Sequence, residues 1–310
     1  MDSKIIKIGT RDSQLALWQA EQVQNSLQQL GYRTQLIAVK SEGDINLTQP
    51  LYEMGITGIF TKALDVAMLT GQIDIAVHSM KDVPTSLPTG LVEGAVLPRA
   101  SFRDILVHKG LDFLNSEGIV ASSSLRRRAQ WLHKYPQHQM TDMRGNVNTR
   151  LQKLNDNSWN GAVFAEAGLA RLGLLENNKV KSSSFEGDYE LLHWMLPAPA
   201  QGAMLVMCIE NDDFSRKAVA QLNDLDTQFA VHIEREFLRT LEGGCTAPIG
   251  ALAEINGKDV HFKGALFSLD GNEKIYVEKQ VPLTEAEDLG KHCAQEILSN
   301  GGEQIMEQLR

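Results

Sequence analysis

The strongest constraint on the fold is an alternation of short apolar runs with longer helical patterns through the first two-thirds of the chain. Most of the short runs are continuous Val, Ile, Leu and Ala, which is typical of strands covered on both faces. Between them lie segments such as 13–30, where apolar side chains recur at helical spacing. This alternation predicts α/β layers with a mostly parallel sheet. The predicted strands are 5–9, 35–39, 73–78, 104–108, 118–121, 161–165 and 204–209.

The rest of the chain has a different pattern. Asn-Gly at 256–257 and Asp-Gly at 270–271 separate strand-like runs within 249–280, as in antiparallel hairpins. Thr284 and Glu287 have the spacing of a capping box, which predicts a helix with apolar positions 289, 293 and 297. These features predict a small α+β domain. The segment 179–188 is the most polar in the chain and is expected to be a surface loop.

Composition excludes several classes of protein. The 310 residues are 43% hydrophobic and 22% charged, as in an ordinary globular protein, and the net charge of −9 argues against general affinity for nucleic acid or anionic membrane. No apolar run approaches the ~20 residues of a membrane span, and the first residues lack the apolar core of a signal peptide. Nucleotide-binding and zinc-binding motifs are absent, so no metal is expected. We therefore expect a cytoplasmic protein.

Three cysteines are too few for a secreted disulfide framework. Cys208 lies in a buried-strand pattern and Cys293 on the apolar stripe of the last helix, so both are expected in the core. Cys245 differs because it lies in the segment LEGGCTAPIG at 241–250, between glycines and a proline. Such a loop presents a thiol at a surface or cleft. Its local sequence fits a functional thiol and an incidental one equally well.

Arginines gather where predicted strands meet predicted helices. The segment SSSLRRR at 122–128 follows one strand, Arg144 and Arg150 lie in RGNVNTR, and Arg11 follows the first strand. Serine hydroxyls and free backbone N–H groups at a helix N-terminus bind anions, and arginine forks match carboxylates. Solvated surface charge would explain a single arginine. Five of these arginines at such junctions, in a chain of net charge −9, instead favour a polyanionic ligand: Arg11, Arg126, Arg127, Arg144 and Arg150.

Lys81 and Asp82 follow the predicted strand 73–78 in the segment HSMKDVP. They would project at the carboxyl end of a strand, where active sites of α/β proteins form. The alternative is a salt-bridged turn closed by Pro84, since charged turns are common.

Six segments together closely resemble the porphobilinogen deaminase family, also called hydroxymethylbilane synthases. The resemblance runs in order from residue 5 to the C-terminal helix. The segments are GTRDSQLALWQA at 9–20, HSMKDVP at 78–84, SSSLRR at 122–127, RGNVNTR at 144–150, PAQGA at 199–203 and LEGGCTAPIG at 241–250.

This resemblance implies an activity and a cofactor. Members of the family join four porphobilinogen molecules head to tail with loss of ammonia and release linear hydroxymethylbilane. They carry a dipyrromethane cofactor, attached by a thioether to the cysteine that matches Cys245. The expected catalytic residues are Asp82, which matches the family's catalytic carboxylate, and Lys81 beside it.

The resemblance also implies which residues hold carboxylates. An arginine-lined site suits this chemistry, because every porphobilinogen unit adds two negative charges to the growing chain. The expected cofactor-binding residues are Cys245, Lys81, Asp82, Ser122, Ser123, Ser124, Arg126, Arg127 and Arg144. The expected substrate-binding residues are Arg11, Ser13, Phe60, Arg150 and Gln201.

The family fold implies two lobes like those of periplasmic binding proteins and a third, small α+β domain. By this resemblance, domain 1 is 1–99 plus 200–218, domain 2 is 100–199 and domain 3 is 219–310, in a monomer. One departure concerns the loop 42–57, where Thr57 stands in place of the lysine of many members. Any contact from a loop lysine to substrate is therefore in doubt. Glu42 and Asp44 would also repel carboxylates if they faced the cleft.

The sequence is also compatible with two other functions. A non-catalytic two-lobe protein that binds polycarboxylates would account for the lobes and arginines, but not for Cys245 or Asp82. A thiol acyl transferase would use Cys245, but it needs a histidine base, and none of the eight histidines lies in a comparable loop motif.

Overall fold

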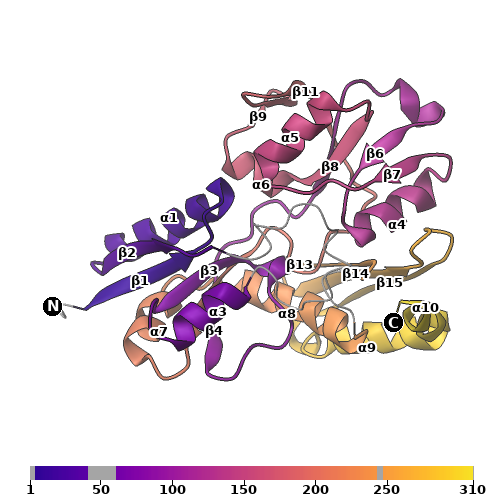
Figure 1. Cartoon of the computed structure of the whole chain (residues 1–310). Coiled ribbons are helices and arrows are strands. Elements are labelled where there is room, and N and C mark those ends of the chain that lie inside the picture. The colour runs from indigo at the N-terminus through magenta and orange to yellow at the C-terminus, as the bar shows by residue number, and fades with distance from the viewer. Residues whose placement is uncertain (1–3, 41–60, 243–246, 310) are drawn as a thin grey trace. The chain divides into compact units, whose positions relative to one another are not determined.

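The computed structural model describes residues 4–40, 61–242 and 247–309. They form two compact units (Figure 1). The first unit comprises 4–40, 61–100 and 202–229, and the second comprises 101–201 and the described residues from 230 onward. No helix in these ranges is both long enough and apolar enough to span a membrane. The second unit contains two separate sheets, so the division into three domains stays a prediction.

The first unit is built on a five-stranded sheet in the order β2-β1-β3-β12-β4. β1 (Ile5–Thr10), β2 (Arg33–Ala38) and β3 (Ile75–Ser79) are parallel, whereas β12 (Met204–Ile209) runs antiparallel to both β3 and β4 (Leu91–Val96). The prediction of a mostly parallel sheet is therefore wrong. The sheet is mixed because β12 enters it from a distant part of the chain rather than through a helical crossover.

Helices cover both faces of this sheet. α1 (Gln14–Gln29) and α7 (Asp213–Ala220) share one apolar core with alternate residues of β1 and β3, among them Ile8 and Val77. α3 (Lys62–Leu69) packs on the other face, where a Cβ at Gly9 would overlap the side chains of Ile73 and Leu64. The predicted helix 13–30 is confirmed, although Leu30 is 45% exposed because it lies beyond the last helical residue.

The second unit contains a seven-stranded mixed sheet in the order β7-β6-β8-β5-β11-β10-β9. The parallel strands are β7 (Gln139–Thr141), β6 (Ile119–Ala121) and β8 (Gly161–Ala165). The antiparallel part is β5 (Asp104–His108), β11 (Glu186–Leu191), β10 (Lys179–Lys181) and β9 (Leu175–Glu176).

The expected surface loop at 179–188 is wrong, because β10 and β11 form a hairpin there. In β11 exposed residues alternate with half-buried ones, and in β10 Val180 is completely buried in the core of this unit. A hairpin near the end of a sheet keeps many side chains exposed, so its average composition is polar although it forms two strands.

Three helices follow the parallel strands of this sheet, each starting at the carboxyl end of a strand. They are α4 (Leu125–Lys134), α5 (Val147–Asp156) and α6 (Glu166–Arg171) (Figure 1). A short helical turn, η3 (Asp112–Asn115), lies between β5 and β6. This order places the three helix N-termini at one edge of the sheet, where anions bind most readily.

The C-terminal part starts with α8 (Leu225–Thr240) and continues into an antiparallel sheet of β13 (Ile249–Asn256), β14 (Asp259–Phe267) and β15 (Lys274–Pro282). Both predicted hairpin turns are confirmed, with Gly257 at φ +66° and Gly271 at φ +77°. The chain ends in α9 (Leu289–Ile297), the π-helical turn η5 (Leu298–Gly302) and α10 (Glu303–Gln308).

The predicted capping box is wrong. Residues 283–285 form a separate turn, η4 (Leu283–Glu285), and α9 starts only at Leu289, with Asp288 at the N-cap position and no side-chain cap bond. The apolar positions 289, 293 and 297 are nevertheless buried as expected. Periodicity located the buried face of this helix, but a short turn separates the helix from its apparent cap.

Candidate functional site

Lys81 and Asp82 lie in η2 (Met80–Asp82), directly after β3, as the sequence predicts. Two backbone bonds fix this turn: Met80 N donates to Ala203 O at 3.1 Å, and Val83 N donates to Met80 O at 3.1 Å. Both charged side chains are half-buried. Within the described part of the chain, no hydrogen bond or ion pair involves the Asp82 carboxylate. A carboxylate held at a strand end without a partner is suited to bind or protonate a ligand.

Arg11 directly follows β1, and His78 lies in the adjacent parallel strand β3. The charge of Arg11 acts on the His78 imidazole. The His78 side chain is only 5% exposed. Burial, and secondarily the positive charge of Arg11, lowers the pKa of His78 to about 4. The imidazole is therefore neutral near pH 7 and adds no positive charge beside Arg11.

Ser13, an expected substrate-binding residue, is the N-cap of α1, and its Oγ accepts a hydrogen bond from Ala16 N at 3.4 Å. This contact explains why the helix starts here. The first backbone N–H groups of a helix have no partner within it, and the Ser13 hydroxyl accepts a hydrogen bond from one of them. The first unit thus brings Arg11, Ser13, Lys81 and Asp82 to the carboxyl ends of β1 and β3.

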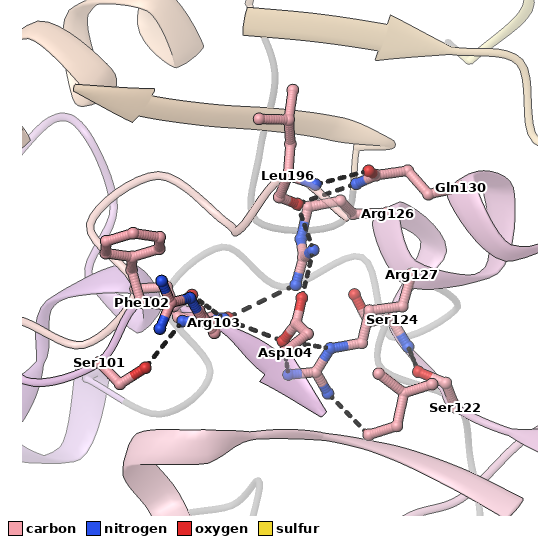
Figure 2. A network of polar contacts seen from close by, with 12 residues as sticks. Ser101, Phe102, Arg103, Asp104, Ser122, Ser124, Arg126, Arg127, Gln130 and Leu196 are labelled. Carbon is pink, nitrogen blue, oxygen red and sulfur yellow. Dashed lines mark hydrogen bonds and ion pairs between the residues drawn. The ribbon is translucent and has the colours of Figure 1, made fainter. Parts of the chain in front are cut away.

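Arg126 and Arg127, in the first turn of α4, converge on Asp104 at the start of β5 (Figure 2). Arg126 Nη1 lies 2.7 Å from Asp104 Oδ2. Arg127 donates to Asp104 Oδ1 from Nε at 3.1 Å and from Nη2 at 2.8 Å. All three side chains are buried. The two arginines are therefore not solvated surface charges, since both already bind the internal carboxylate of Asp104.

Asp104 is ionised in this cluster. Burial alone would raise the pKa of this carboxyl, but the charges of Arg126 and Arg127 outweigh it and lower the pKa to about 2. One carboxylate thus faces two guanidinium groups, which leaves the cluster with one net positive charge. Arg126 Nε is buried and has no hydrogen-bond partner among the described residues. Excess positive charge and an unused donor are features that a further anionic group would satisfy.

Gln201 belongs to the same cluster. Its Nε2 donates to Phe102 O at 2.7 Å and to Asp104 Oδ1 at 2.9 Å, while its Oε1 accepts from Arg126 Nη2 at 3.4 Å. The structure therefore brings together three residues that the sequence predicts as binding residues. It adds Asp104, which sequence reasoning missed. The available signal was an acidic residue at the start of a strand whose next three residues are apolar.

The serines before α4 are partly committed to the backbone. Ser122 is buried and its Oγ accepts from Ser124 N at 3.3 Å, while Ser123 Oγ accepts from Met143 N at 2.7 Å. Ser124 occupies the N-cap position of α4 without making a side-chain cap bond. The Ser124 hydroxyl therefore does not close the N-terminus of α4, where the helix dipole favours an anion.

Arg144 and Arg150 flank the start of α5. Burial lowers the pKa of Arg144, with Asp142 acting in the opposite direction. Arg150 Nε donates to Gly145 O at 2.7 Å, and Lys153 Nζ donates to Arg144 O at 3.0 Å. Arg171 at the end of α6 is a further cation that sequence reasoning missed, and burial lowers its pKa to about 10. It stands in a short helix without a distinctive motif.

Comparison with known proteins decides the family. Residues 6–217 match the family model described as "Porphobilinogen deaminase, dipyromethane cofactor binding domain", and residues 228–299 match "Porphobilinogen deaminase, C-terminal domain". The chain belongs to the porphobilinogen deaminase family. The six segments that suggested this family from the sequence lie within the two matched ranges.

Two curated relatives span nearly the whole chain. The porphobilinogen deaminase of Syntrophotalea carbinolica is 40% identical over 99% of this chain and 96% of its own length. The porphobilinogen deaminase of Pelobacter propionicus is 39% identical over 100% of this chain and 98% of its own length. Among solved structures, the methionine-binding protein MetQ is similar with a TM-score of 0.44 and 16% identity, covering 76% of this chain and 96% of that one.

Several expected residues lie outside the described part of the chain. They are Cys245, Phe60 and the loop 42–57 with Glu42, Asp44 and Thr57. The expected core positions of the other two thiols are confirmed, since Cys208 and Cys293 are both buried.

The dipyrromethane cofactor named by the family model carries carboxylates, and the residues present fit such a group. The Asp104 cluster retains one net positive charge and one unused buried donor, and the N-terminus of α4 has no side-chain cap. Arg144 and Arg150 add two further cations at the start of α5. This donor set matches a polycarboxylate.

Proposed function

We propose that this chain joins four porphobilinogen molecules head to tail and releases linear hydroxymethylbilane, in the manner of its family. The observation that carries the proposal is the match to porphobilinogen deaminases over nearly the full length of the chain and of its relatives. The arginine-rich strand ends support it, because each substrate unit brings an acetate and a propionate. The family match leaves the non-catalytic binding protein and the thiol acyl transferase without support.

Asp82 is proposed as the acid-base residue. When an amine leaves porphobilinogen, positive charge develops on the pyrrole unit, and a nearby carboxylate stabilises that charge. The same group gives a proton to the leaving amine and later removes one from the pyrrole carbon that has reacted. The position of Asp82 in a fixed turn, with no partner among the described residues, supports this assignment. Lys81 beside it is proposed to pair with ligand carboxylates.

The remaining binding residues divide between cofactor and substrate. When bound, the dipyrromethane cofactor supplies the pyrrole end to which the first substrate is added. Cys245 is proposed to hold it by a thioether, and its carboxylates would pair with the serines and arginines of α4 and with Arg144. Arg11, Ser13, Phe60, Arg150 and Gln201 are proposed to bind substrate. We further propose three domains with the boundaries given above, a monomer, and action in the cytoplasm.

The mass of the intact protein tests this function. We expect the purified chain to exceed its sequence mass by two pyrrole units, and we expect Cys245→Ser to abolish the increase. Cys208→Ala and Cys293→Ala are matched controls, because both thiols are buried in the core and should leave the added mass unchanged. A chain that converts porphobilinogen without any added mass would overturn the proposal.

A further inference from the structure

The chain between β11 and β12 contains a short segment, residues 196–201, that we call the strap. Leu196 is held by α4: its carbonyl accepts from Arg126 Nη1 at 2.6 Å and from Gln130 Nε2 at 2.9 Å, and its N–H donates to Gln130 Oε1 at 2.8 Å (Figure 2). Pro197 O accepts from Ala251 N of β13 at 3.1 Å. The strap thus starts against both α4 and the three-stranded sheet.

The other end of the strap is held by a buried acid. Glu234 lies in α8 and is completely buried. Its Oε2 accepts from Ala200 N of the strap at 2.6 Å, and its Oε1 accepts from Ala253 N of β13 at 2.8 Å. A carboxylate is suited to this position because both of its oxygens accept hydrogen bonds. Glu234 therefore joins α8, β13 and the strap at a single point.

The bond to Ala200 fixes an unusual backbone conformation. Ala200 has a φ of +61°, in the left-handed region that residues other than glycine rarely adopt. The next residue is Gln201, whose side chain contacts Asp104 and Arg126. The direction in which the Gln201 side chain leaves the backbone depends on the left-handed turn immediately before it. A change at Ala200 would therefore move the Gln201 amide away from the arginine cluster.

We propose that Glu234 is a positioning residue for carboxylate binding. It holds Ala200 in the left-handed conformation and thereby directs Gln201 toward Asp104 and Arg126. This inference rests on the proposed function, in which these arginines bind carboxylates of the substrate and cofactor. It assigns a role in the reaction to a completely buried side chain of α8.

The isosteric change Glu234→Gln is the sharpest test. An amide has one accepting oxygen, so its NH2 group must face the N–H of either Ala200 or Ala253. We expect the KM for porphobilinogen to rise about tenfold while kcat changes less than about twofold, as when a binding contact is lost. Glu234→Asp, whose shorter side chain cannot reach both donors, should change KM in the same direction if Glu234→Gln yields too little folded protein.

A matched control separates positioning from loss of stability. Val260→Ala removes buried apolar volume from β14, away from the strap, and should lower the melting temperature while leaving KM unchanged. Hydrogen exchange of peptides covering 196–203 should accelerate in Glu234→Gln and not in Val260→Ala. Wild-type KM and wild-type exchange in Glu234→Gln would overturn the inference. A wild-type chain that does not convert porphobilinogen would instead overturn the proposed function.

A double-mutant cycle tests the route through Gln201. Gln201→Met keeps the length of the side chain and removes its hydrogen bonds. If Glu234 acts by directing Gln201, the rise in KM for Glu234→Gln combined with Gln201→Met should be no greater than for Gln201→Met alone. If the fold-rises in KM of the two single variants multiply in the double variant, Glu234 acts by another route and the inference is overturned.

Discussion

Arg127 donates two hydrogen bonds to a single oxygen of Asp104, from Nε at 3.1 Å and from Nη2 at 2.8 Å. The other oxygen of Asp104 accepts from Arg126, so one buried carboxylate organises both guanidinium groups. Removing one member of a buried ion pair lowers the free energy of unfolding by far more than the intact pair adds to it, because the remaining charges stay buried without compensation. The orientation of both arginines therefore depends on Asp104.

Asp104→Asn should lower the free energy of unfolding by about 3–5 kcal/mol, because two buried guanidiniums lose their counter-charge. Urea denaturation measures this loss. Asp142→Asn is the matched control, since Asp142 is partly exposed and lies 3.4 Å from Arg128. That partly exposed pair should contribute less than about 1 kcal/mol. Equal losses in the two variants would contradict the assigned role of Asp104.

The ion pairs of Asp104 also predict that the stability of the protein depends on pH. The pKa of Asp104 is lowered from 3.8 to about 2, so the unfolded chain takes up a proton at a higher pH than the folded chain does. The stabilisation is fully present above pH 4 and is lost as the pH falls from 4 to 2, and it amounts to about 2 kcal/mol. Denaturation at several pH values should show a shallower slope in this window for Asp104→Asn than for the wild type.

His78 should titrate near pH 4, because burial and the Arg11 charge oppose protonation. The unfolded chain is protonated below about pH 6.5, so the folded protein loses up to about 3 kcal/mol as the pH falls from 6.5 to 4. NMR titration of the imidazole measures the midpoint directly. A midpoint near 6.5 would show that His78 is solvated and not buried beside Arg11.

Asp82→Asn should retain the cofactor mass and reduce kcat by about 10²–10⁴, because proton transfer loses its acid and base. Steady-state assays and intact mass are measured on the same preparation. Asp112→Asn changes an exposed aspartate of η3 and should leave both values unchanged. Normal turnover in Asp82→Asn would refute the catalytic assignment.

Gly145→Ala should destabilise the start of α5, which carries Arg150. Gly145 has a φ of +118°, and a Cβ there would lie 2.7 Å from Thr149 Cγ2. We expect a loss of about 2–3 kcal/mol in thermal unfolding, from backbone strain and overlap together. Gly173→Ala isolates the strain, since Gly173 has a φ of +67° and no atom of the described residues lies within 4 Å of its Cβ position. A loss of about 1 kcal/mol is expected there.

Cys208 and Cys293 should resist alkylation in the folded protein. Burial raises the pKa of each thiol to about 12, so almost no reactive thiolate is present at pH 8. Mass spectrometry after treatment with iodoacetamide should find both thiols unmodified before denaturation and modified after it. Rapid labelling of either in the native protein would contradict its core position.

Local sequence predicted the parts of the fold that depend on local pattern. The strands 104–108 and 161–165 are found with the predicted bounds because each is a short run, mostly apolar, that is buried on both faces. The hairpin at 179–191 escaped prediction because its polar residues alternate with few buried ones. The antiparallel entry of β12 also has no local signal, since its partner strands lie more than a hundred residues earlier in the chain.

The sequence by itself determined the family, the α/β class, the turn that carries Lys81 and Asp82, and the gathering of arginines at strand ends. Only the tertiary structure decided which of those arginines are already paired. Asp104 is 22 residues from Arg126 and 97 residues from Gln201 in sequence, and no local spacing connects them. Burial is the physical reason. A carboxylate removed from water needs counter-charges, and the tertiary structure supplies them from residues that are distant in the sequence.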